Sequence, residues 1–233
     1  MKYMGSKRRI AKHILPIMLK EAEKHGINTW VEPFVGGGNM IDKVPDNYNR
    51  IGYDLNDHAI HAMIGIRDHL DDIPTTVSEE YYKSIKGKDP HYIDSWIRIA
   101  CSFGGKLDNG YARGGGRNHV LEALKNATKQ SPLIQNIDLI CDSYENLSFN
   151  NCLIYCDPPY KNTTGYKTAY FDHDKFYSWC IEQSKNNIVF ISEYDMPSEF
   201  EEVWKGEIKT NFASSRTKAT HEAVEKLYIV NRG

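Results

Sequence analysis

Short apolar runs that alternate with stretches of helical character are the sequence feature that most limits the fold. The runs have the length of buried strands and lie at Thr29–Phe34, Arg50–Leu55, Ile137–Cys141, Leu153–Cys156, Ile188–Ile191 and Leu227–Val230. Helices are expected at Ser6–His25, Asn56–Leu70 and Asp174–Ser184. Strands that alternate with helices in this way predict an α/β fold with a mostly parallel sheet covered by helices on both faces.

Three positions predict where individual helices begin or are interrupted. Pro16 lies inside the first predicted helix and should kink or split it, because proline has no backbone N–H to donate. A further helix is expected from Asn39, directly behind Gly36-Gly37-Gly38, and Asn56 is expected to cap the helix after that.

Residues 75–135 interrupt the alternation. They contain an amphipathic stretch at Tyr92–Ala100, a glycine-rich loop at Gly104–Gly116 and a predicted helix at about Asn118–Lys129. Residues 81–130 hold nine Lys and Arg against four Asp and Glu, a local charge of +5, whereas the whole chain has −2 and its remainder therefore −7. This asymmetry predicts an α/β domain made of residues 1–74 and 136–233, with a small, mostly helical basic insertion at 75–135.

Composition excludes several classes of protein. A chain with 29 Lys and Arg against 31 Asp and Glu is not a polycation that coats nucleic acid with its whole surface. No run of about eighteen apolar residues is present, so no membrane span is expected, and no apolar segment follows the charged N-terminus as in a secretory signal. The five cysteines form no C-x-x-C pair, and His58 and His61 lack further ligand partners nearby. We therefore expect a cytoplasmic protein without a disulfide framework or a metal site.

The first candidate site follows the apolar run that ends at Phe34. Gly36-Gly37-Gly38 lets the backbone approach a ligand closely, because glycine has no Cβ. Ile41 stands where a dinucleotide-binding turn carries its third glycine, and the carboxylate of Glu32 would repel a pyrophosphate while suiting a cationic sulfonium amino acid. A plain turn between a strand and a helix is the alternative.

Asp54 ends the second predicted strand, 16 residues after Gly38. An acidic residue at this place in a doubly wound sheet commonly accepts hydrogen bonds from ribose hydroxyls. The alternative is that Asp54 or Asn56 only caps the helix that follows, and the two roles are compatible.

The most specific motif is Asp157-Pro158-Pro159-Tyr160, directly after the apolar strand Leu153–Cys156. Two successive prolines restrict the backbone, so the preceding carbonyl groups are held in a rigid geometry. Asp157 offers a carboxylate acceptor, Pro158 a carbonyl acceptor and Tyr160 a plane for stacking. Such a set suits an exocyclic aromatic amine, and ligands bind at the carboxyl ends of parallel strands.

This motif, together with Val31–Gly38 and Lys2–Lys7, resembles the Dam-type (D12 class) DNA adenine-N6 methyltransferases. In the tail, Ser215-Arg216-Thr217 and Glu225–Ile229 are similar to the closing hairpin of that family. The resemblance implies a Rossmann-like class I methyltransferase sheet, and it implies that residues 75–135 are the region that recognises the DNA target.

The resemblance also implies S-adenosylmethionine as the cofactor. The positions that match cofactor-binding motifs are Tyr3, Met4, Gly5, Lys7, Glu32, Pro33, Phe34, Gly36, Gly38, Asn39, Asp54, Leu55, Asp142, Ser143 and Asp157. Tyr3 and Lys7 would lie over the pocket, and the turn from Phe34 to Gly38 would line the methionine part. Asp54 would bind the ribose, and Asp142-Ser143 would contact the adenine.

Catalysis would rest on Asp157, Pro158, Pro159 and Tyr160. The N6 lone pair of adenine is delocalised into the ring, and hydrogen bonds to Asp157 and to the Pro158 carbonyl would localise it for attack on the sulfonium methyl. The base must leave the duplex to reach such a site, and Tyr160 would stack on it. Packing in the core is preferred for Cys156 over a role as nucleophile.

Double-stranded DNA is the implied partner, with contacts expected from Lys106, Tyr111, Arg113 and Arg117 in the basic insertion. Arginine can pair with guanine in the major groove and lysine with phosphate, although each residue taken alone is equally compatible with a solvated surface charge. Tyr3 stands where many relatives carry tryptophan. Gly104–Gly116 differs from members that recognise GATC, so the target sequence stays open, as does a partner restriction enzyme. A monomer that acts on a short site is expected.

Two other hypotheses stay open at this point. The chain could methylate another planar amine or amide, such as an adenine in RNA or a glutamine in a protein. It could also be a DNA-binding module that keeps the fold without catalysis. The intact glycine turn, Asp54 and the Asp157–Tyr160 motif favour the DNA adenine methyltransferase over both.

Overall fold

The computed structural model describes residues 1–114, 116–160, 171–210 and 221–231. The chain divides into two compact units, Met1–Lys12 with Thr29–Asn146 and His13–Asn28 with Leu147–Gly233. Seven strands form a sheet in the order β3-β2-β1-β4-β5-β7-β6. The predicted α/β fold with a Rossmann-like sheet is confirmed.

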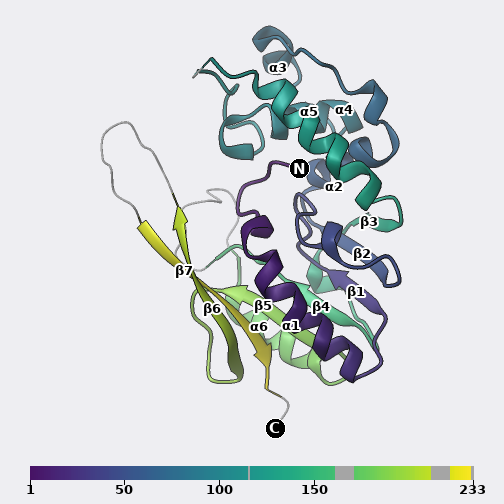
Figure 1. Ribbon diagram of the computed structural model, residues 1–233, viewed down its shortest axis with the longest axis vertical. Coiled ribbons are helices and arrows are strands. Elements are labelled where there is room, and N and C mark those ends of the chain that lie inside the picture. The colour runs from purple at the N-terminus through teal and green to yellow at the C-terminus, as the bar shows by residue number, and fades with distance from the viewer. Residues whose placement is uncertain (115, 161–170, 211–220, 232–233) are drawn as a thin grey trace. The chain divides into compact units, whose positions relative to one another are not determined.

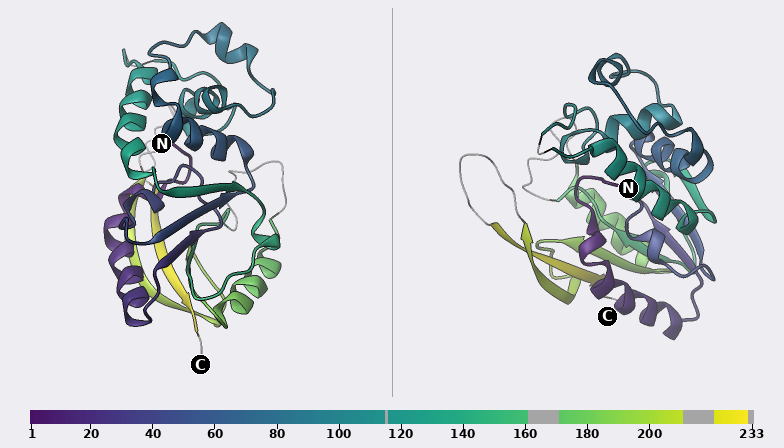
Figure 2. Two further views of the ribbon diagram at one scale, coloured as in Figure 1. Left: turned by 90° about the vertical axis from the view of Figure 1, so that its right-hand side faces the viewer. Right: turned by 45° about the horizontal axis from the view of Figure 1, so that its top comes forward.

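Three parallel strands make up the sheet of the first unit. They are β1 (Thr29–Glu32), β2 (Asn49–Asp54) and β3 (Ile137–Cys141), with β2 between the other two. They lie side by side in Figure 2. Each strand lies within one of the predicted apolar runs or extends it by a single residue. The prediction of parallel pairing is confirmed for this part of the sheet.

Four helices belong to the first unit, namely α2 (Asp57–Asp68), α3 (Glu79–Ser84), α4 (Tyr92–Ala100) and α5 (His119–Gln130). α4 packs against α2 and buries Trp96 completely. The side chain of Asn118 caps α5 by accepting a hydrogen bond from the backbone N–H of Leu121 at 3.0 Å. The amphipathic stretch and the helix predicted between residues 75 and 135 are therefore present, and α3 is an additional short helix.

The second unit contains β4 (Leu153–Cys156), β5 (Ile188–Glu193), β6 (Phe200–Thr210) and β7 (His221–Val230). β4 and β5 are parallel, whereas β7 is antiparallel to both β5 and β6. Figure 1 shows β6 and β7 as a long paired ribbon. Helix α6 (His173–Ser184) belongs to this unit, as does most of α1 (Ala11–Lys24).

One local prediction is wrong and two are wrong in part. α1 continues through Pro16, so the proline does not split the helix, and the alternative of a kink stays a prediction. No α-helix begins at Asn39, where only a single 3₁₀ turn at Ile41–Lys43 follows the glycines. Asn56 does occupy the N-cap position of α2, but its side chain caps no helical N–H and donates to the hydroxyl of Tyr3 instead.

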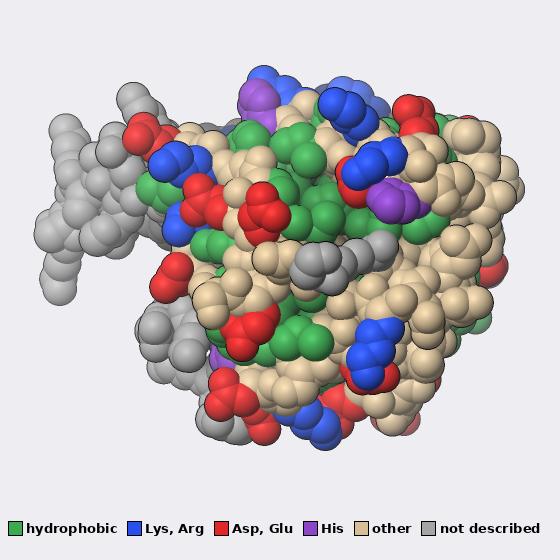
Figure 3. Space-filling model, turned by 90° about the horizontal axis from the view of Figure 1, so that it is seen from below, with side chains coloured by type: hydrophobic (Ala, Val, Ile, Leu, Met, Phe, Trp, Pro, Cys, Tyr) green, Lys and Arg blue, Asp and Glu red, His purple; other side chains and the backbone are tan. Residues whose placement is uncertain are grey.

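The remaining 3₁₀ turns are Lys7–Arg9, Leu70–Asp72, Phe103–Gly105, Ser131–Leu133 and Tyr144–Asn146. Across the residues that the structure describes, no helix is long and apolar enough to cross a membrane. On the face displayed in Figure 3, acidic and basic side chains are interspersed among hydrophobic ones. That face therefore offers a mixed surface rather than a basic one.

Gly65 in α2 gives a test of the packing between α2 and α4. A Cβ at this position would lie 2.9 Å from the backbone oxygen of Tyr92, which no rotamer change can move. Alanine normally stabilises a helix over glycine by about 1 kcal/mol, whereas overpacking costs about 1–3 kcal/mol. We expect Gly65→Ala to lower the free energy of unfolding by about 1 kcal/mol in urea denaturation. A gain in stability would contradict this packing.

Candidate active site

The carboxylate of Asp54 holds the glycine turn behind β1. Oδ2 accepts a hydrogen bond from the backbone N–H of Gly36, and Oδ1 accepts one from that of Asn56, each at 2.8 Å. Gly36 and Gly38 have φ values of +49° and +65°, which glycine adopts without the strain that a Cβ brings. Each carboxylate oxygen carries two lone pairs, so Asp54 keeps acceptor capacity beyond these bonds.

The side chain of Tyr3 packs on this turn. A Cβ at Gly36 would lie 2.8 Å from Cε1 of Tyr3, and a Cβ at Gly37 would lie 2.6 Å from its Cβ. The hydroxyl of Tyr3 accepts a hydrogen bond from the side-chain amide of Asn56 at 3.3 Å. The glycines are therefore required for the N-terminal segment to approach, and the predicted motifs around Tyr3, Gly36 and Asp54 meet at one place.

Phe34 and Asp142 join the same cluster. The rings of Phe34 and Tyr144 lie 5.5 Å apart between centroids, and the backbone N–H of Asp142 donates to the carbonyl of Asp54 at 3.2 Å. The Asp142 carboxylate accepts hydrogen bonds from the backbone N–H of Ser143 and from the Asn146 side chain, both at 2.7 Å.

Leu55 lies at the end of β2, beside Asp54. It is 72% exposed, which is a large apolar surface left uncovered at the carboxyl end of a parallel strand. An uncovered apolar side chain next to a carboxylate acceptor suits a ligand with a planar ring and hydroxyl groups.

Other predicted cofactor residues form the frame around the turn. Glu32 is buried and accepts a hydrogen bond from the indole N–H of Trp30 at 2.9 Å. Asn39 is buried and donates to the carbonyl of Met1 at 2.9 Å, and the ammonium group of Lys7 donates to the carbonyl of Gly5 at 3.0 Å.

Two further predicted positions, Met4 and Pro33, belong to this frame. The backbone N–H of Met4 donates to the carbonyl of Gly105 at 3.2 Å, and Pro33 is buried directly after β1. The side chains of the frame are thus engaged within the protein, in contrast to Leu55.

The Asp157–Tyr160 motif follows β4 directly in the second unit, with Asp157 and Tyr160 half-buried and Pro158 buried. The hydroxyl of Tyr160 donates to Oε2 of Glu225 in β7 at 2.7 Å. Its ring meets that of Tyr194, the residue after β5, edge to face at a centroid distance of 4.7 Å. Burial, together with the nearby carboxylates of Asp157 and Glu225, raises the pKa of Tyr160 well above its ordinary value, so the hydroxyl stays protonated and can donate.

Tyr194 and Glu225 are the contacts that the sequence analysis did not assign to this site. Tyr194 could have been suspected, because an aromatic residue directly after a buried strand lies at the edge where ligands bind. Glu225 carries no such local signal, since only its place in β7 brings it to Tyr160. The preceding residue, Cys156, is completely buried beside Cys180, which confirms packing as its role.

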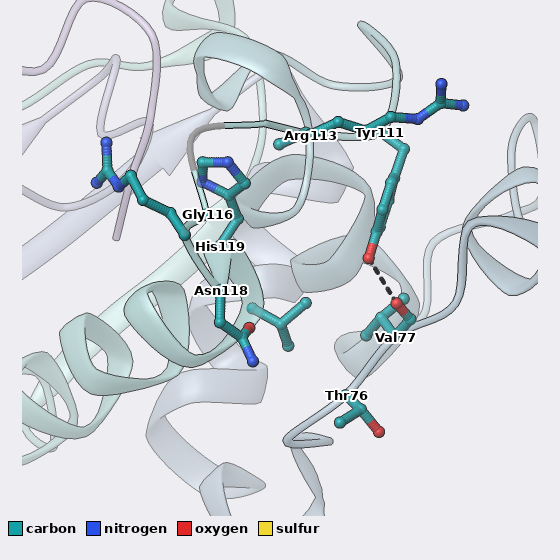
Figure 4. A pocket seen from close by; sticks show the side chains of 10 residues that line it. Thr76, Val77, Tyr111, Arg113, Gly116, Asn118 and His119 are labelled. Atoms are coloured by element: carbon teal, nitrogen blue, oxygen red, sulfur yellow. Dashed lines mark hydrogen bonds between the residues drawn. The ribbon is translucent and has the colours of Figure 1, made fainter.

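The first unit also contains a cavity of about 450 Å³ next to the predicted DNA contacts. It is lined by Thr76, Val77, Tyr111, Ala112, Arg113, Gly116, Arg117, Asn118, His119 and Val120. The hydroxyl of Tyr111 donates to the carbonyl of Val77 at 2.6 Å, as the dashed line in Figure 4 marks. Lys106 is half-buried and not among the lining residues.

Both arginines of this cavity hold a carboxylate. Arg113 forms an ion pair with Glu79 of α3, and Arg117 forms a two-bond pair with Glu122 of α5, with N–O distances of 2.7 and 2.5 Å. The structure thus brings together Tyr111, Arg113 and Arg117, three of the four predicted DNA contacts.

Ser215-Arg216-Thr217 lies outside the described residues. Within the described ranges, no group of three or more His, Cys, Asp or Glu side chains could hold a metal ion.

A parallel sheet with glycine and acidic residues at its strand ends is compatible with a methyltransferase, and the comparisons with known proteins point to that class. The model of the D12 class N6 adenine-specific DNA methyltransferases matches residues 3–96, which confirms the resemblance to that family, while Asp157–Tyr160 lies outside the matched residues. The chain is a methyltransferase. It is 24% identical over 214 residues to the type II methyltransferase M.MjaIII of Methanocaldococcus jannaschii, an alignment that covers 75% of this chain and 73% of that protein.

Solved structures with a similar arrangement include two with low sequence identity. One is the Thermoplasma acidophilum protein 1320, with 8% identity and a TM-score of 0.47 over 95% of this chain and 87% of that one. Another is the N-terminal domain of human METTL16 in complex with SAH, with 7% identity and a TM-score of 0.43 over 95% and 70%.

Asp54 gives a prediction about pH. Burial raises its pKa from 3.8 to about 6, against the opposing effect of the N–H bonds from Asn56 and Gly36. Between these two values the native state binds more protons than the unfolded state, so stability falls as pH rises and levels off above about 6. The shift corresponds to about 3 kcal/mol.

In Asp54→Asn, we expect the free energy of unfolding, measured by urea denaturation, to show no such fall between pH 4 and 6. Asp71→Asn, which removes an exposed carboxylate of the same unit, is the control and should keep it. The same pH profile in wild type and Asp54→Asn would show that Asp54 does not titrate as assigned.

Proposed function

We propose that the chain transfers a methyl group from S-adenosylmethionine to the N6 amine of adenine in DNA. The observation that carries the proposal is the Asp157–Tyr160 motif, a carboxylate, two prolines and an aromatic ring placed directly after the buried strand β4. The match of residues 3–96 to the D12 class model supports the same reaction.

The residues around the glycine turn fit the cofactor. Asp54 retains lone pairs for ribose hydroxyls, and the exposed Leu55 offers an apolar surface for the adenine ring. Phe34 and Asp142-Ser143 would add to the same site, and Tyr3 would cover it from the N-terminal segment. When bound, S-adenosylmethionine supplies an electrophilic methyl group on a sulfonium.

The remaining cofactor positions have a supporting part in this proposal. Glu32, Asn39, Lys7 and Pro33 are buried. The first three make hydrogen bonds within β1, between the glycine turn and Met1, and within the N-terminal segment, respectively. Asp157 would contribute from the catalytic motif.

The chemical task of Asp157 and Pro158 is to accept hydrogen bonds from the two N–H groups of the target amine. Such bonds favour a pyramidal nitrogen with a localised lone pair, which attacks the methyl group in line. S-adenosylmethionine would supply the methyl group and would accept the electron pair of the broken C–S bond as a neutral thioether, and the amine proton would pass to the Asp157 carboxylate that already accepts its hydrogen bond. Pro159 restricts the backbone that follows the Pro158 carbonyl.

Tyr160 would stack on the base after it leaves the duplex. The hydrogen bond to Glu225 and the edge contact with Tyr194 restrict the orientation of its ring before any base arrives. A ring that is already oriented loses little conformational entropy on stacking, which makes the base contact more favourable.

DNA would be bound through the insertion 75–135, with Lys106, Tyr111, Arg113 and Arg117 as its contacts. The convergence of three of these residues on one cavity supports this assignment. Action as a monomer stays a prediction, and a partner restriction enzyme stays an open question.

Labelled-methyl transfer tests the reaction. We expect wild-type protein to label duplex DNA in preference to RNA or protein, and Asp157→Ala to reduce transfer to background because the amine loses its charged acceptor. Asp195→Ala, which removes an exposed carboxylate after β5, is the control and should keep activity. Normal turnover by Asp157→Ala, or labelling of RNA or protein instead of DNA, would contradict the proposal.

Tyr160→Ala separates base capture from cofactor binding. We expect the loss of stacking to weaken binding of duplexes that contain the target base by about 1–3 kcal/mol, measured with 2-aminopurine fluorescence. Cofactor affinity from calorimetry should stay unchanged. Tyr160→Phe removes only the hydrogen bond to Glu225 and should retain most of the stacking. An equal loss of cofactor affinity in Tyr160→Ala would instead place Tyr160 in the cofactor pocket.

A further inference from the structure

The cavity beside α5 has an arrangement that the proposed DNA contacts alone do not explain. Arg113 and Arg117 each present a guanidinium group, yet each is paired with a carboxylate of the same unit, Glu79 and Glu122. The two positive charges are therefore cancelled locally. A fork of two guanidinium N–H groups that binds a carboxylate also binds a phosphate in the same geometry.

A second observation points to a ligand at this place. Nε2 of His119 is buried and has no hydrogen-bond partner in the described part of the chain. His119 lines the cavity and is the first residue of α5, a helix of 12 residues. In Figure 4 its imidazole ring lies beside Gly116. An unpaired imidazole nitrogen at a helix N-terminus suits an anion.

Both arginines can leave their carboxylates at low cost. The side chains of Arg113 and Arg117 are 67% and 63% exposed, and ion pairs this exposed contribute little to stability. Glu79 keeps a second partner, because Lys83 lies 2.7 Å from it. Glu122 is 41% exposed, so water can solvate it once Arg117 has left.

We propose that Glu79 and Glu122 occupy the positions that DNA phosphates take on Arg113 and Arg117, so that this cavity is a phosphodiester site held closed by the protein's own carboxylates. This inference rests on the proposed function, since DNA is the partner. The paired state lowers the affinity for DNA that offers only its backbone. A duplex that makes additional contacts elsewhere displaces both carboxylates, and Nε2 of His119 then gains a phosphate oxygen as partner.

Charge-neutral variants test the carboxylates. We measure the dissociation constant of Glu79→Gln and Glu122→Gln for a 20-base-pair duplex by fluorescence anisotropy over a series of salt concentrations. Each is expected to bind about three- to tenfold more tightly than wild type. In wild type, the displaced carboxylate takes up cations when DNA binds, which offsets part of the counterions that the DNA releases. The variants lack this carboxylate, so the slope of log K against log salt should steepen by up to about 0.9 for each freed arginine.

The matched control is Glu80→Gln, which removes the same charge from the neighbouring residue of α3. Glu80 is exposed and has no ion pair with an arginine among the described residues. It reports the general effect of a lost negative charge. In an Arg117→Ala background, Glu122→Gln should change affinity no more than Glu80→Gln does, because the arginine that it frees is missing.

Two results would overturn the inference, and they are distinguishable. Equal dissociation constants and salt slopes for Glu79→Gln, Glu122→Gln and Glu80→Gln would refute the role of the carboxylates while the proposed function stands. Failure of the wild-type chain to bind duplex DNA at any salt concentration would refute both. Thermal melting of each variant shows that the comparison is made on folded protein.

Discussion

The two hydrogen bonds to Asp54 are the interaction on which the candidate cofactor site depends. They connect the end of β2 to the glycine turn behind β1 and to the first residue before α2, so one carboxylate sets three segments. The ring of Tyr3 packs on this glycine turn, and the side-chain amide of Asn56 holds the ring by a hydrogen bond to the Tyr3 hydroxyl. A carboxylate in this role must give up part of its hydration, and the raised pKa of about 6 reflects that cost. In the proposed function the same group would already be oriented for ribose hydroxyls.

Much of the fold could be predicted from the sequence, because buried parallel strands are short apolar runs bounded by polar residues. β3 and β4 have the predicted limits for this reason. The predicted helix behind the glycines is wrong because Met40 and Ile41 are buried although only a 3₁₀ turn forms there, so apolar residues at this place do not indicate the buried face of an α-helix. β6 was missed because it is an edge strand rich in charged residues, and only its pairing with β7 defines it.

In the candidate site, too, local sequence motifs could be predicted, whereas contacts that depend on strand pairing could not. The glycine turn, Asp54 and the Asp157–Tyr160 motif are local patterns, so sequence alone indicates them. The contacts of Tyr160 depend on the register of β7 against β5, in which Lys226 lies opposite Glu193, and no local pattern encodes this pairing. Asn56 shows the same limit, since its sequence context suits a cap while the nearby hydroxyl of Tyr3 takes its side chain.

The electrostatics of the insertion show why a charge count does not describe a binding surface. The count of +5 over residues 81–130 begins two residues after Glu79, the acid that pairs with Arg113, and the buried Arg98 pairs with the half-buried Asp108. The charge that a polyanion meets at the cavity beside α5 thus depends on local ion pairs rather than on the net charge of the segment. Exposed ion pairs exchange partners easily, whereas the pair of Arg98 with Asp108 does not, because separating it would leave the buried guanidinium without compensation. The segment 75–135 therefore combines a less exposed pair with exchangeable pairs at the cavity, and under the proposed function only the latter would be available to DNA.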